Sequence, residues 1–192
     1  MNGSLFDEQD LQSALAVLRA GGVILYPTDT VWGIGCDATL DEAVSRIYAL
    51  KERADTKSML VLWHDRESLA QYVMVPAKVE QLLDESDKPT TIIYPKVHGL
   101  SSKLVAEDGS VGVRLTKESF TMALCEQFGH PIVSTSANIS GEQTPRNYEQ
   151  ISDSIRARVD YICMYRRDDR TEHEPSRIIR VRQDNTYDIL RK

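Results

Sequence analysis

Stretches with the periodicity of a helix alternate with short apolar stretches of strand character along most of this 192-residue chain. In the first pair, Leu11, Leu15 and Leu18 share one face of a helix predicted over 10–20, and a strand is predicted at 23–26. Regular alternation of helices and strands is typical of an α/β domain, in which helices pack against a central sheet. The sequence therefore predicts an α/β fold around a largely buried, mixed β-sheet.

The same patterns predict the remaining elements and some of their ends. Asp41 is the expected N-cap of the second helix, Gly129 is expected to end a later helix, and "QDN" at 183–185 is expected to turn a hairpin. The predicted helices after the first cover residues 41–51, 65–73, 76–83, 117–128 and 147–155. The predicted strands after the first cover residues 59–63, 90–94, 110–115, 131–133, 161–165, 176–182 and 186–190.

Length and composition favour one soluble domain. The chain is 41% hydrophobic and 27% charged, and no apolar run approaches the ~18 residues of a membrane span. The first ten residues have neither the basic nor the apolar region of a secretory signal. Cys36, Cys125 and Cys163 are far apart and form no C-x-x-C pair, which argues against disulfides and a zinc site. We therefore expect a single domain over 6–192, located in the cytoplasm and away from membranes.

The net charge of −6 argues against strong non-specific binding to nucleic acids. The charge is uneven, because residues 156–192 hold ten Lys or Arg and seven Asp or Glu, whereas residues 1–155 carry a net charge of −9. The basic end could face a phosphate, or it could be solvated surface, which is the usual state of a charge run. Residues 168–175, "DDRTEHEP", lie between two predicted strands and are a candidate mobile loop over a site.

Four polar segments lie where predicted strands or helices end, which is where α/β sheets bind ligands. Each segment also has a simpler interpretation: a turn, cations near a helix C-terminus, a solvated strand arginine and a polar loop. The motifs of phosphate loops, dinucleotide sites, zinc proteases and serine hydrolases are absent from the sequence. The segments are "YPTDTVWGIG" at 26–35, "KERADTK" at 51–57, "VGVRL" at 111–115 and "VSTSANISGE" at 133–142.

Two of these segments supply cations. Lys51 and Arg53 follow a predicted helix, and an ammonium together with a guanidinium suits a polyphosphate. Arg114 is expected to share one strand face with Gly112, whose small size would leave space beside the guanidinium. Both segments therefore favour a site for anions.

The last segment supplies neutral hydrogen-bonding groups. Ser134, Ser136 and Asn138 alternate along the chain, so an extended backbone would point all three the same way. Thr135 and Ala137 would then pack on the other side. Hydroxyl and amide groups in this arrangement could bind a carboxylate or phosphate without adding charge.

In this order and at this spacing, the four segments resemble the YrdC/Sua5 family of L-threonylcarbamoyladenylate synthases, from about Phe6 to Arg191. The resemblance implies a twisted, open sheet flanked by helices, with a concave active-site surface. It also implies that threonylcarbamoyl-AMP and pyrophosphate are formed from L-threonine, bicarbonate and ATP, with Mg²⁺ accompanying ATP. The product would serve a downstream transferase complex that makes N6-threonylcarbamoyladenosine at position 37 of tRNA.

The resemblance further implies roles for individual residues. The catalytic residues that it implies are Lys51, Arg53, Ser136 and Asn138. The threonine-binding residues are Thr30, Arg114, Ser134 and Ser176. The ATP-binding residues are Arg53, Lys57, Ser110, Ser136, Thr144 and Arg191. No residue is expected to ligate a metal ion directly.

The chain departs from the family pattern at several positions. Lys57 and Ser58 stand where many relatives have Asn-Pro, and Arg177 stands where Thr is common, so the roles of Lys57 and Arg177 are open. The chain resembles the short, single-domain YrdC type rather than the two-domain Sua5 type. The alternative interpretation is an RNA- or tRNA-binding module without turnover of its own.

Overall fold

The computed structural model describes residues 6–52 and 59–192. Most of the elements lie within a few residues of their predicted ranges. The helices are α1 (Glu8–Arg19), α2 (Asp41–Leu50), α3 (Arg66–Leu69), α4 (Ala77–Glu85), α5 (Ser119–Phe128) and α6 (Asp153–Arg156), with 3₁₀ turns η1 (Ser102–Leu104) and η2 (Tyr148–Gln150). The strands are β1 (Ile24–Tyr26), β2 (Gly33–Gly35), β3 (Leu60–Trp63), β4 (Thr90–Tyr94), β5 (Val111–Leu115), β6 (Ile132–Ser136), β7 (Tyr161–Ile162), β8 (Arg177–Val181) and β9 (Tyr187–Arg191).

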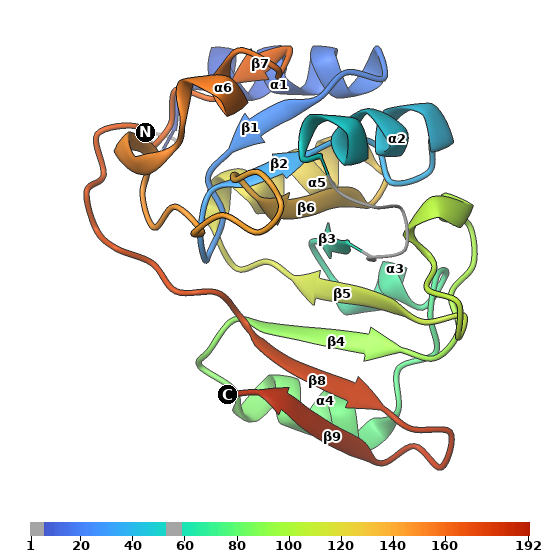
Figure 1. The fold of residues 1–192 in the computed structure, drawn as a ribbon. Helices are drawn as coiled ribbons and strands as arrows, with labels where there is room; N and C mark the ends of the chain where they lie inside the picture. The colour runs from blue at the N-terminus through green and yellow to red at the C-terminus, as the bar shows by residue number, and fades with distance from the viewer. Residues whose placement is uncertain (1–5, 53–58) are drawn as a thin grey trace.

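Within the described ranges, the strands form one nine-stranded sheet in the order β7-β1-β2-β6-β3-β5-β4-β8-β9. β1 and β2 run antiparallel, whereas β3 runs parallel to β5 and β4 runs parallel to β8. The last two strands form the expected antiparallel hairpin. Figure 1 shows that the sheet is open and twists from β7 at one end to β9 at the other. The predicted α/β fold with a twisted, open, mixed sheet is confirmed.

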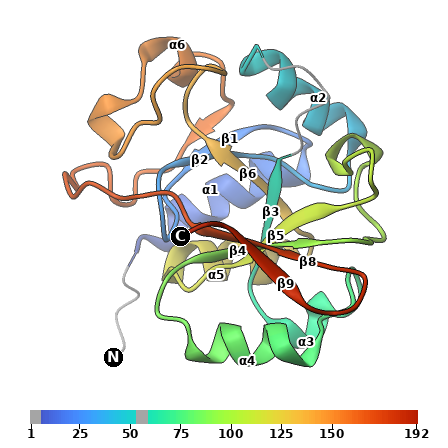
Figure 2. The same cartoon turned by 60° about the horizontal axis from the view of Figure 1, so that its bottom comes forward.

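Helices cover both faces of the part of the sheet that β1, β2 and β6 form. Ile24 and Tyr26 pack toward α1 and α5, whereas Leu25 packs on the face that α2 covers. This alternation follows from the strand geometry, in which successive side chains point to opposite faces. Figure 2 shows α3 and α4 beside the other half of the sheet, near β4, β8 and β9.

Two predicted helices are shorter in the structure. The helix predicted over 65–73 contracts to α3, and the one predicted over 147–155 is divided between η2 and α6. The division has a local cause, because the Ser152 hydroxyl accepts a hydrogen bond from the Ile155 backbone N–H and begins a new helix there. A capping residue inside the predicted range thus interrupts the helix.

The strand predicted over 161–165 ends at Ile162 because the backbone turns toward a buried carboxylate. The N–H groups of Met164 and Tyr165 donate to Asp10, which lies on α1 and is fully buried. Backbone donors satisfied in this way are not available to a neighbouring strand. The apolar pattern of residues 161–165 could not reveal this contact.

The predicted N-cap of α2 is wrong. Leu40 occupies the N-cap position without a side-chain hydrogen bond, and Asp41 lies in the first turn of the helix. The Asp41 carboxylate instead accepts a hydrogen bond from the Ser101 hydroxyl at 2.5 Å. By contrast, Gly129 ends α5 with φ at 78°, as the sequence predicted.

The strand β2 was not predicted. It consists of Gly33, Ile34 and Gly35 and lies between β1 and β6. A Cβ atom on Gly35 would lie 2.6 Å from the Tyr26 ring and 2.6 Å from the Val133 carbonyl oxygen. Glycine is therefore required at this position for the backbone of β2 to approach its neighbours.

No helix within residues 6–52 and 59–192 is both long enough and apolar enough to cross a bilayer.

Candidate functional site

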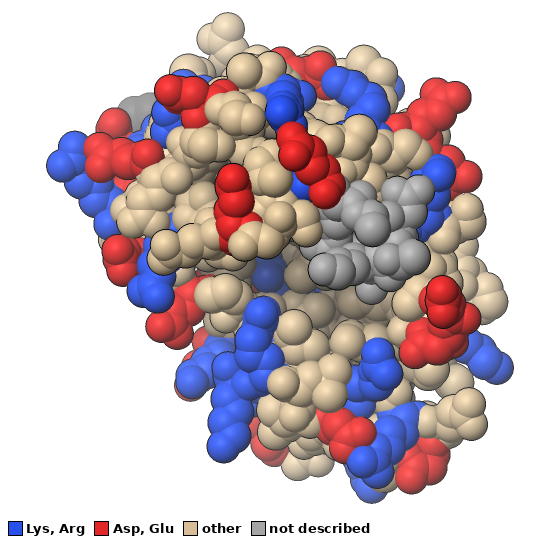
Figure 3. Space-filling model, in the orientation of Figure 1, with Lys and Arg blue, Asp and Glu red and all other residues tan. Residues whose placement is uncertain are grey.

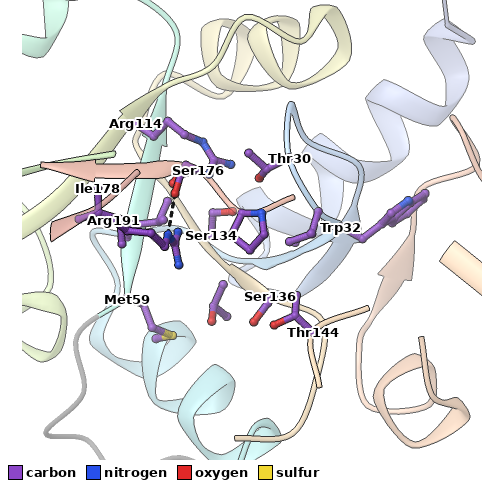
Figure 4. Close-up of a pocket in the computed structure, with 15 residues that line it drawn as sticks. Thr30, Trp32, Met59, Arg114, Ser134, Ser136, Thr144, Ser176, Ile178 and Arg191 are labelled. Carbon is purple, nitrogen blue, oxygen red and sulfur yellow. Dashed lines mark hydrogen bonds between the residues drawn. The ribbon is translucent and has the colours of Figure 1, made fainter. Parts of the chain in front are cut away.

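A cavity of about 270 Å³ lies among the ends of strands from both halves of the sheet. Figure 3 shows a hollow on this face of the molecule, with Lys or Arg atoms at its floor. Figure 4 shows several of the lining side chains converging on the open space. The lining residues are Thr30, Val31, Trp32, Gly33, Met59, Leu60, Arg114, Ser134, Thr135, Ser136, Thr144, Pro175, Ser176, Ile178 and Arg191.

Strand register places two arginines on one side of this cavity. Arg114 on β5 pairs with Thr91 on β4, and Thr91 pairs with Ile178 on β8. Ile178 in turn pairs with Arg191 on β9. A single row across four adjacent strands thus brings together Arg114 and Arg191, which the sequence places far apart.

Arg114 is held by the loop between β1 and β2. One of its terminal nitrogens donates to the Thr28 hydroxyl at 3.3 Å and lies 3.1 Å from the Asp29 carboxylate. The Arg114 side chain is only 4% exposed. The expected gap beside Gly112 does not exist, because a Cβ atom there would lie 3.3 Å from atoms of Leu60 and Thr91.

Arg191 is the second guanidinium at the cavity. Its Nε donates to the backbone oxygen of Ser176 at 2.8 Å, the contact drawn as a dashed line in Figure 4. Burial and the nearby positive charge of Arg114 lower the pKa of Arg191. Two cations that repel each other beside an open space favour an anionic ligand between them.

Neutral hydroxyls complete the wall of the cavity. The hydroxyls of Ser176 and Thr91 lie 2.7 Å apart, and Thr28 and Thr30 form a similar pair at 3.1 Å. Ser134, Thr30 and Ser176 are each at most 5% exposed, so their orientations are fixed by the surrounding packing. These groups can orient a polar ligand without adding charge.

The tyrosine of the "YPTDT" segment lies beneath this hydroxyl set. Tyr26 is fully buried, and its hydroxyl donates to the Val133 carbonyl at 3.2 Å. Burial raises the pKa of Tyr26 far above its ordinary value. A phenol in this state supports β6 as a neutral donor and does not titrate near neutral pH.

Lys51 lies outside the cavity lining and contacts the turn after β6. Its ammonium donates to the backbone oxygens of Ser136 at 2.5 Å and Asn138 at 2.6 Å. The side chain is 1% exposed. In this structure the Lys51 charge therefore binds the segment that carries two of the implied catalytic residues.

The alternation expected in "VSTSANISGE" holds only in part. Ser134 and Ser136 line the cavity as expected, and Ala137 is packed in the core. Thr135 also lines the cavity, although it was expected to pack. Asn138 does not line it, because β6 ends at Ser136 and the chain then turns. Alternation requires an extended backbone, which is lost at that turn.

The Asn138 side chain closes the turn. Its amide nitrogen donates to the backbone oxygens of Ile139 and Glu142 at 2.9 and 3.0 Å. Its Oδ1 is buried and has no hydrogen-bond partner among the described residues. The acceptor half of the amide is thus available to a donor from elsewhere.

The other implied residues are distributed unevenly. Thr144 lines the cavity, whereas Ser110 lies at a turn, where its hydroxyl donates to Asp108 at 2.5 Å. Arg53 and Lys57 lie outside the described residues. Arg177 donates to the hydroxyls of Thr90 and Ser86, away from the cavity lining.

The segment 168–175 joins β7 to β8, and its last residue, Pro175, lines the cavity. Just before it, Arg166 donates to the Thr28 carbonyl at 3.0 Å and forms an ion pair with Asp169 at 2.9 Å. These contacts attach the segment to the loop that holds Arg114. Arg166, Asp29 and Thr91 were not predicted as site residues, although Asp29 lies within the segment "YPTDTVWGIG" and Thr91 within a predicted strand.

The chemistry available at the cavity is electrostatic. In the described ranges, no three His, Cys, Asp or Glu side chains gather where they could hold a metal ion. All three cysteines are buried, and burial raises the pKa of each thiol, so they are poor nucleophiles. The arrangement can bind and orient anions through cations and hydroxyls.

Comparisons with known proteins identify relatives over most of the chain. A family model named for Sua5, YciO and YrdC, and described as "Telomere recombination", matches residues 16–192. The threonylcarbamoyl-AMP synthase of Xanthomonas euvesicatoria pv. vesicatoria is 34% identical over 158 residues, which cover 80% of this chain and 84% of that protein.

Two solved structures are similar in fold. A double variant of P. abyssi Sua5 superimposes with a TM-score of 0.86 at 25% identity and covers 97% of this chain. P. abyssi Sua5 complexed with L-threonine superimposes with a TM-score of 0.81 at 23% identity and covers 92% of this chain. The chain spans 57% and 52% of the lengths of those two Sua5 chains.

Proposed function

Because the chain belongs to the Sua5/YciO/YrdC family, we propose that it is an L-threonylcarbamoyladenylate synthase. It is a nucleotidyltransferase that forms threonylcarbamoyl-AMP and pyrophosphate from L-threonine, bicarbonate and ATP. The observation that carries this proposal is the cavity in which Arg114 and Arg191 face a set of buried hydroxyls. Such a cavity suits a reaction whose substrates are all anions or carry an anionic group.

Threonine binds through its carboxylate to Arg114. A guanidinium can hold a carboxylate with two parallel hydrogen bonds, which fixes orientation as well as position. The hydroxyls of Thr30, Ser134 and Ser176 surround the same space and orient the rest of the amino acid. The hydroxyl-bearing substrate side chain finds several partners there, each able to donate or accept.

ATP binds on the side of the cavity formed by Ser136, Thr144 and Arg191. We assign Arg53 and Lys57 to the phosphates as well, on the family resemblance of their segment, and we leave Ser110 out because its hydroxyl is committed to Asp108. Mg²⁺ enters with ATP and offsets phosphate charge when bound. Arg191 supplies a further positive charge from the protein.

Catalysis requires two bond-forming steps. The threonine amine, once deprotonated, attacks the carbon of bicarbonate, and water is lost to give a carbamate. A carbamate oxygen then attacks the α-phosphorus of ATP, and pyrophosphate leaves. Like-charge repulsion between these groups is offset by Arg114 and Arg191, so positioning and electrostatics carry the rate without a protein nucleophile.

Lys51 and Asn138 act on the end of β6 and on the turn that follows it. The Lys51 ammonium fixes the backbone at Ser136, and the Asn138 amide fixes the turn beyond it. Both residues thereby set the position of the Ser136 hydroxyl at the cavity.

We also propose that the product passes to a downstream transferase complex that modifies tRNA, and that the enzyme acts in the cytoplasm. Direct tRNA contact is weak in this proposal. Ion pairs neutralise several cations of the basic end, including Arg170 with Glu149 and Arg182 with Asp188. A surface neutralised in this way releases few counterions from a nucleic acid.

The proposal is tested by pyrophosphate release from the purified protein. Release should require ATP, L-threonine and bicarbonate together, and it should fall when any one is omitted. The competing function, an RNA-binding module, predicts no release and a tRNA complex whose affinity falls steeply between low and physiological salt. Tight tRNA binding without turnover would favour that alternative.

A further inference from the structure

The carboxylate of Asp29 lies directly against the guanidinium of Arg114. Its Oδ1 is 3.1 Å from a terminal nitrogen of Arg114, and the two side chains are 11% and 4% exposed. A buried charge that loses its partner is strongly destabilised, so this pair offsets the cost of burying the Arg114 guanidinium in the protein without substrate. The same nitrogen donates to the Thr28 hydroxyl, whereas the Oδ1 of Asp29 accepts no hydrogen bond among the described residues, so its contact with Arg114 is an ion pair at one terminal nitrogen.

A second nitrogen of the Arg114 guanidinium, Nε, remains available to bind a ligand. Its Nε is buried and has no hydrogen-bond partner within the described parts of the chain. Buried donors of this kind normally have a partner, and an arginine can engage a carboxylate through Nε and a terminal nitrogen at once. A terminal nitrogen of Arg114 is thus held by protein contacts, while its Nε lacks a hydrogen-bond acceptor. The side chain lies beside the cavity that Figure 4 shows.

Asp29 does not line that cavity. It lines a second cavity of about 430 Å³ whose wall includes Leu115, Lys117 and Glu118, and Arg114 does not line this second cavity. The ion pair therefore lies between the two cavities, with Arg114 on the substrate side and Asp29 behind it. A substrate carboxylate can reach Arg114 without displacing Asp29.

Asp29 also offsets repulsion between the two arginines. Arg114 lies close enough to Arg191 for its positive charge to contribute, after burial, to lowering the pKa of Arg191. Without a nearby carboxylate, this repulsion would move a guanidinium away from the cavity. A fixed negative charge behind Arg114 keeps it in place before the substrate arrives.

From these contacts, and on the basis of the proposed function, we propose that Asp29 is a positioning residue for threonine. It holds the Arg114 guanidinium from the side of the second cavity, so that Nε, which has no other partner among the described residues, can receive the substrate carboxylate. Its contribution is therefore specific to ligands that carry a carboxylate. A residue that only stabilised the loop would affect all ligands of the cavity alike.

The test compares the binding of L-threonine and L-threoninamide by titration calorimetry. Threoninamide keeps the amine and the side chain but replaces the carboxylate by a neutral amide. For Asp29→Asn, we expect the Kd for threonine to rise about tenfold and the Kd for threoninamide to change less than about threefold. Asp87→Asn is the matched control, because it removes the same charge from an exposed residue on the wall of the second cavity.

Equal weakening of both ligands would assign Asp29 a general structural role and overturn the proposal. Unchanged or tighter threonine binding would also overturn it, because Asp29 would then merely compete with the substrate. Failure of the wild-type protein to bind threonine would instead contradict the proposed function. If Asp29→Asn does not fold, a crystal structure of the wild-type threonine complex decides: Arg114 should contact Asp29 and the ligand carboxylate together, and loss of the Asp29 contact would refute the proposal.

Discussion

At the scale of single residues, Lys51 shows how a charge can serve a site without facing it. The family resemblance implies that it is catalytic, and the physical expectation from sequence was a clamp for phosphate. The structure places its ammonium against two backbone oxygens at the end of β6. Ser136, the first residue that accepts from Lys51, lies 85 residues after it in the sequence, so no local pattern could predict this contact.

Replacement of Lys51 by methionine isolates the effect of its charge. Lys51→Met keeps the apolar stem but leaves two buried carbonyl groups without their charged donor, so we expect the free energy of unfolding to fall by about 2 kcal/mol. We expect the rate of pyrophosphate release to fall about 100-fold, because the Ser136 hydroxyl loses its fixed position. Urea denaturation and single-turnover assays measure the two effects.

Lys103→Met is a useful comparison for this variant, since Lys103 lies on the η1 turn outside the cavity lining. A Lys51→Met protein with wild-type activity and stability would show that the contacts with β6 contribute little.

The other site residues divide by the kind of information that reveals them. Thr30, Arg114 and Ser134 could be placed at one cavity because each lies in one of the four segments that carry the resemblance, and Ser176 because the resemblance assigns it the same role. Asp29 could not, since its partner Arg114 lies on a different strand and the pairing depends on how the loop folds back. Ion pairs between distant segments require the three-dimensional structure.

At the scale of elements, apolar periodicity predicted most helices and strands. It failed where a single polar contact controls the backbone, as at Asp10, which ends β7, and at Ser152, which begins α6. It also missed β2, because two of its three residues are glycine and have no side chain to reveal alternation. In that strand the small residues are required by the approach of Tyr26 and Val133.

Substitution of Gly35 tests this explanation of β2. Gly35→Ala places a methyl group 2.6 Å from a buried ring and from a backbone oxygen, neither of which can move freely. We expect the free energy of unfolding to fall by about 3 kcal/mol, as in overpacked cores. Gly112→Ala, whose nearest atoms would lie at 3.3 Å, should cost less. Equal stability of the two variants in urea denaturation would contradict this account.

At the scale of the whole molecule, ion pairs attach the C-terminal third of the chain to the rest. Asp160, which precedes β7, pairs with Arg46 on α2 at 2.9 Å and accepts from the Val23 N–H at 2.7 Å. The hydrogen bond from Arg46 lowers the pKa of Asp160. A carboxylate of the C-terminal third thus binds both a cation on α2 and the backbone just before β1.

This arrangement predicts a dependence of stability on acid. Because the folded pKa of Asp160 is depressed, its contribution is complete above the unfolded value of about 3.9 and is lost as the pH falls through the folded value. We expect Asp160→Asn to cost about 1 kcal/mol or less at pH 7, since the pair is partly exposed, and clearly less at pH 2.

Urea denaturation at both pH values measures this difference, and Asp87→Asn serves as an exposed control. A loss of stability in Asp160→Asn that is the same at pH 7 and pH 2 would show that the charge of Asp160 is not what stabilises the contact.

The central claim is that the cavity joins threonine, bicarbonate and ATP in one product. The most direct measurement is mass spectrometry of the product formed from ¹³C-bicarbonate, L-threonine and Mg-ATP. The account predicts threonylcarbamoyl-AMP that carries the heavy carbon. An adenylate of threonine without that carbon, or no adenylate from folded protein, would contradict it.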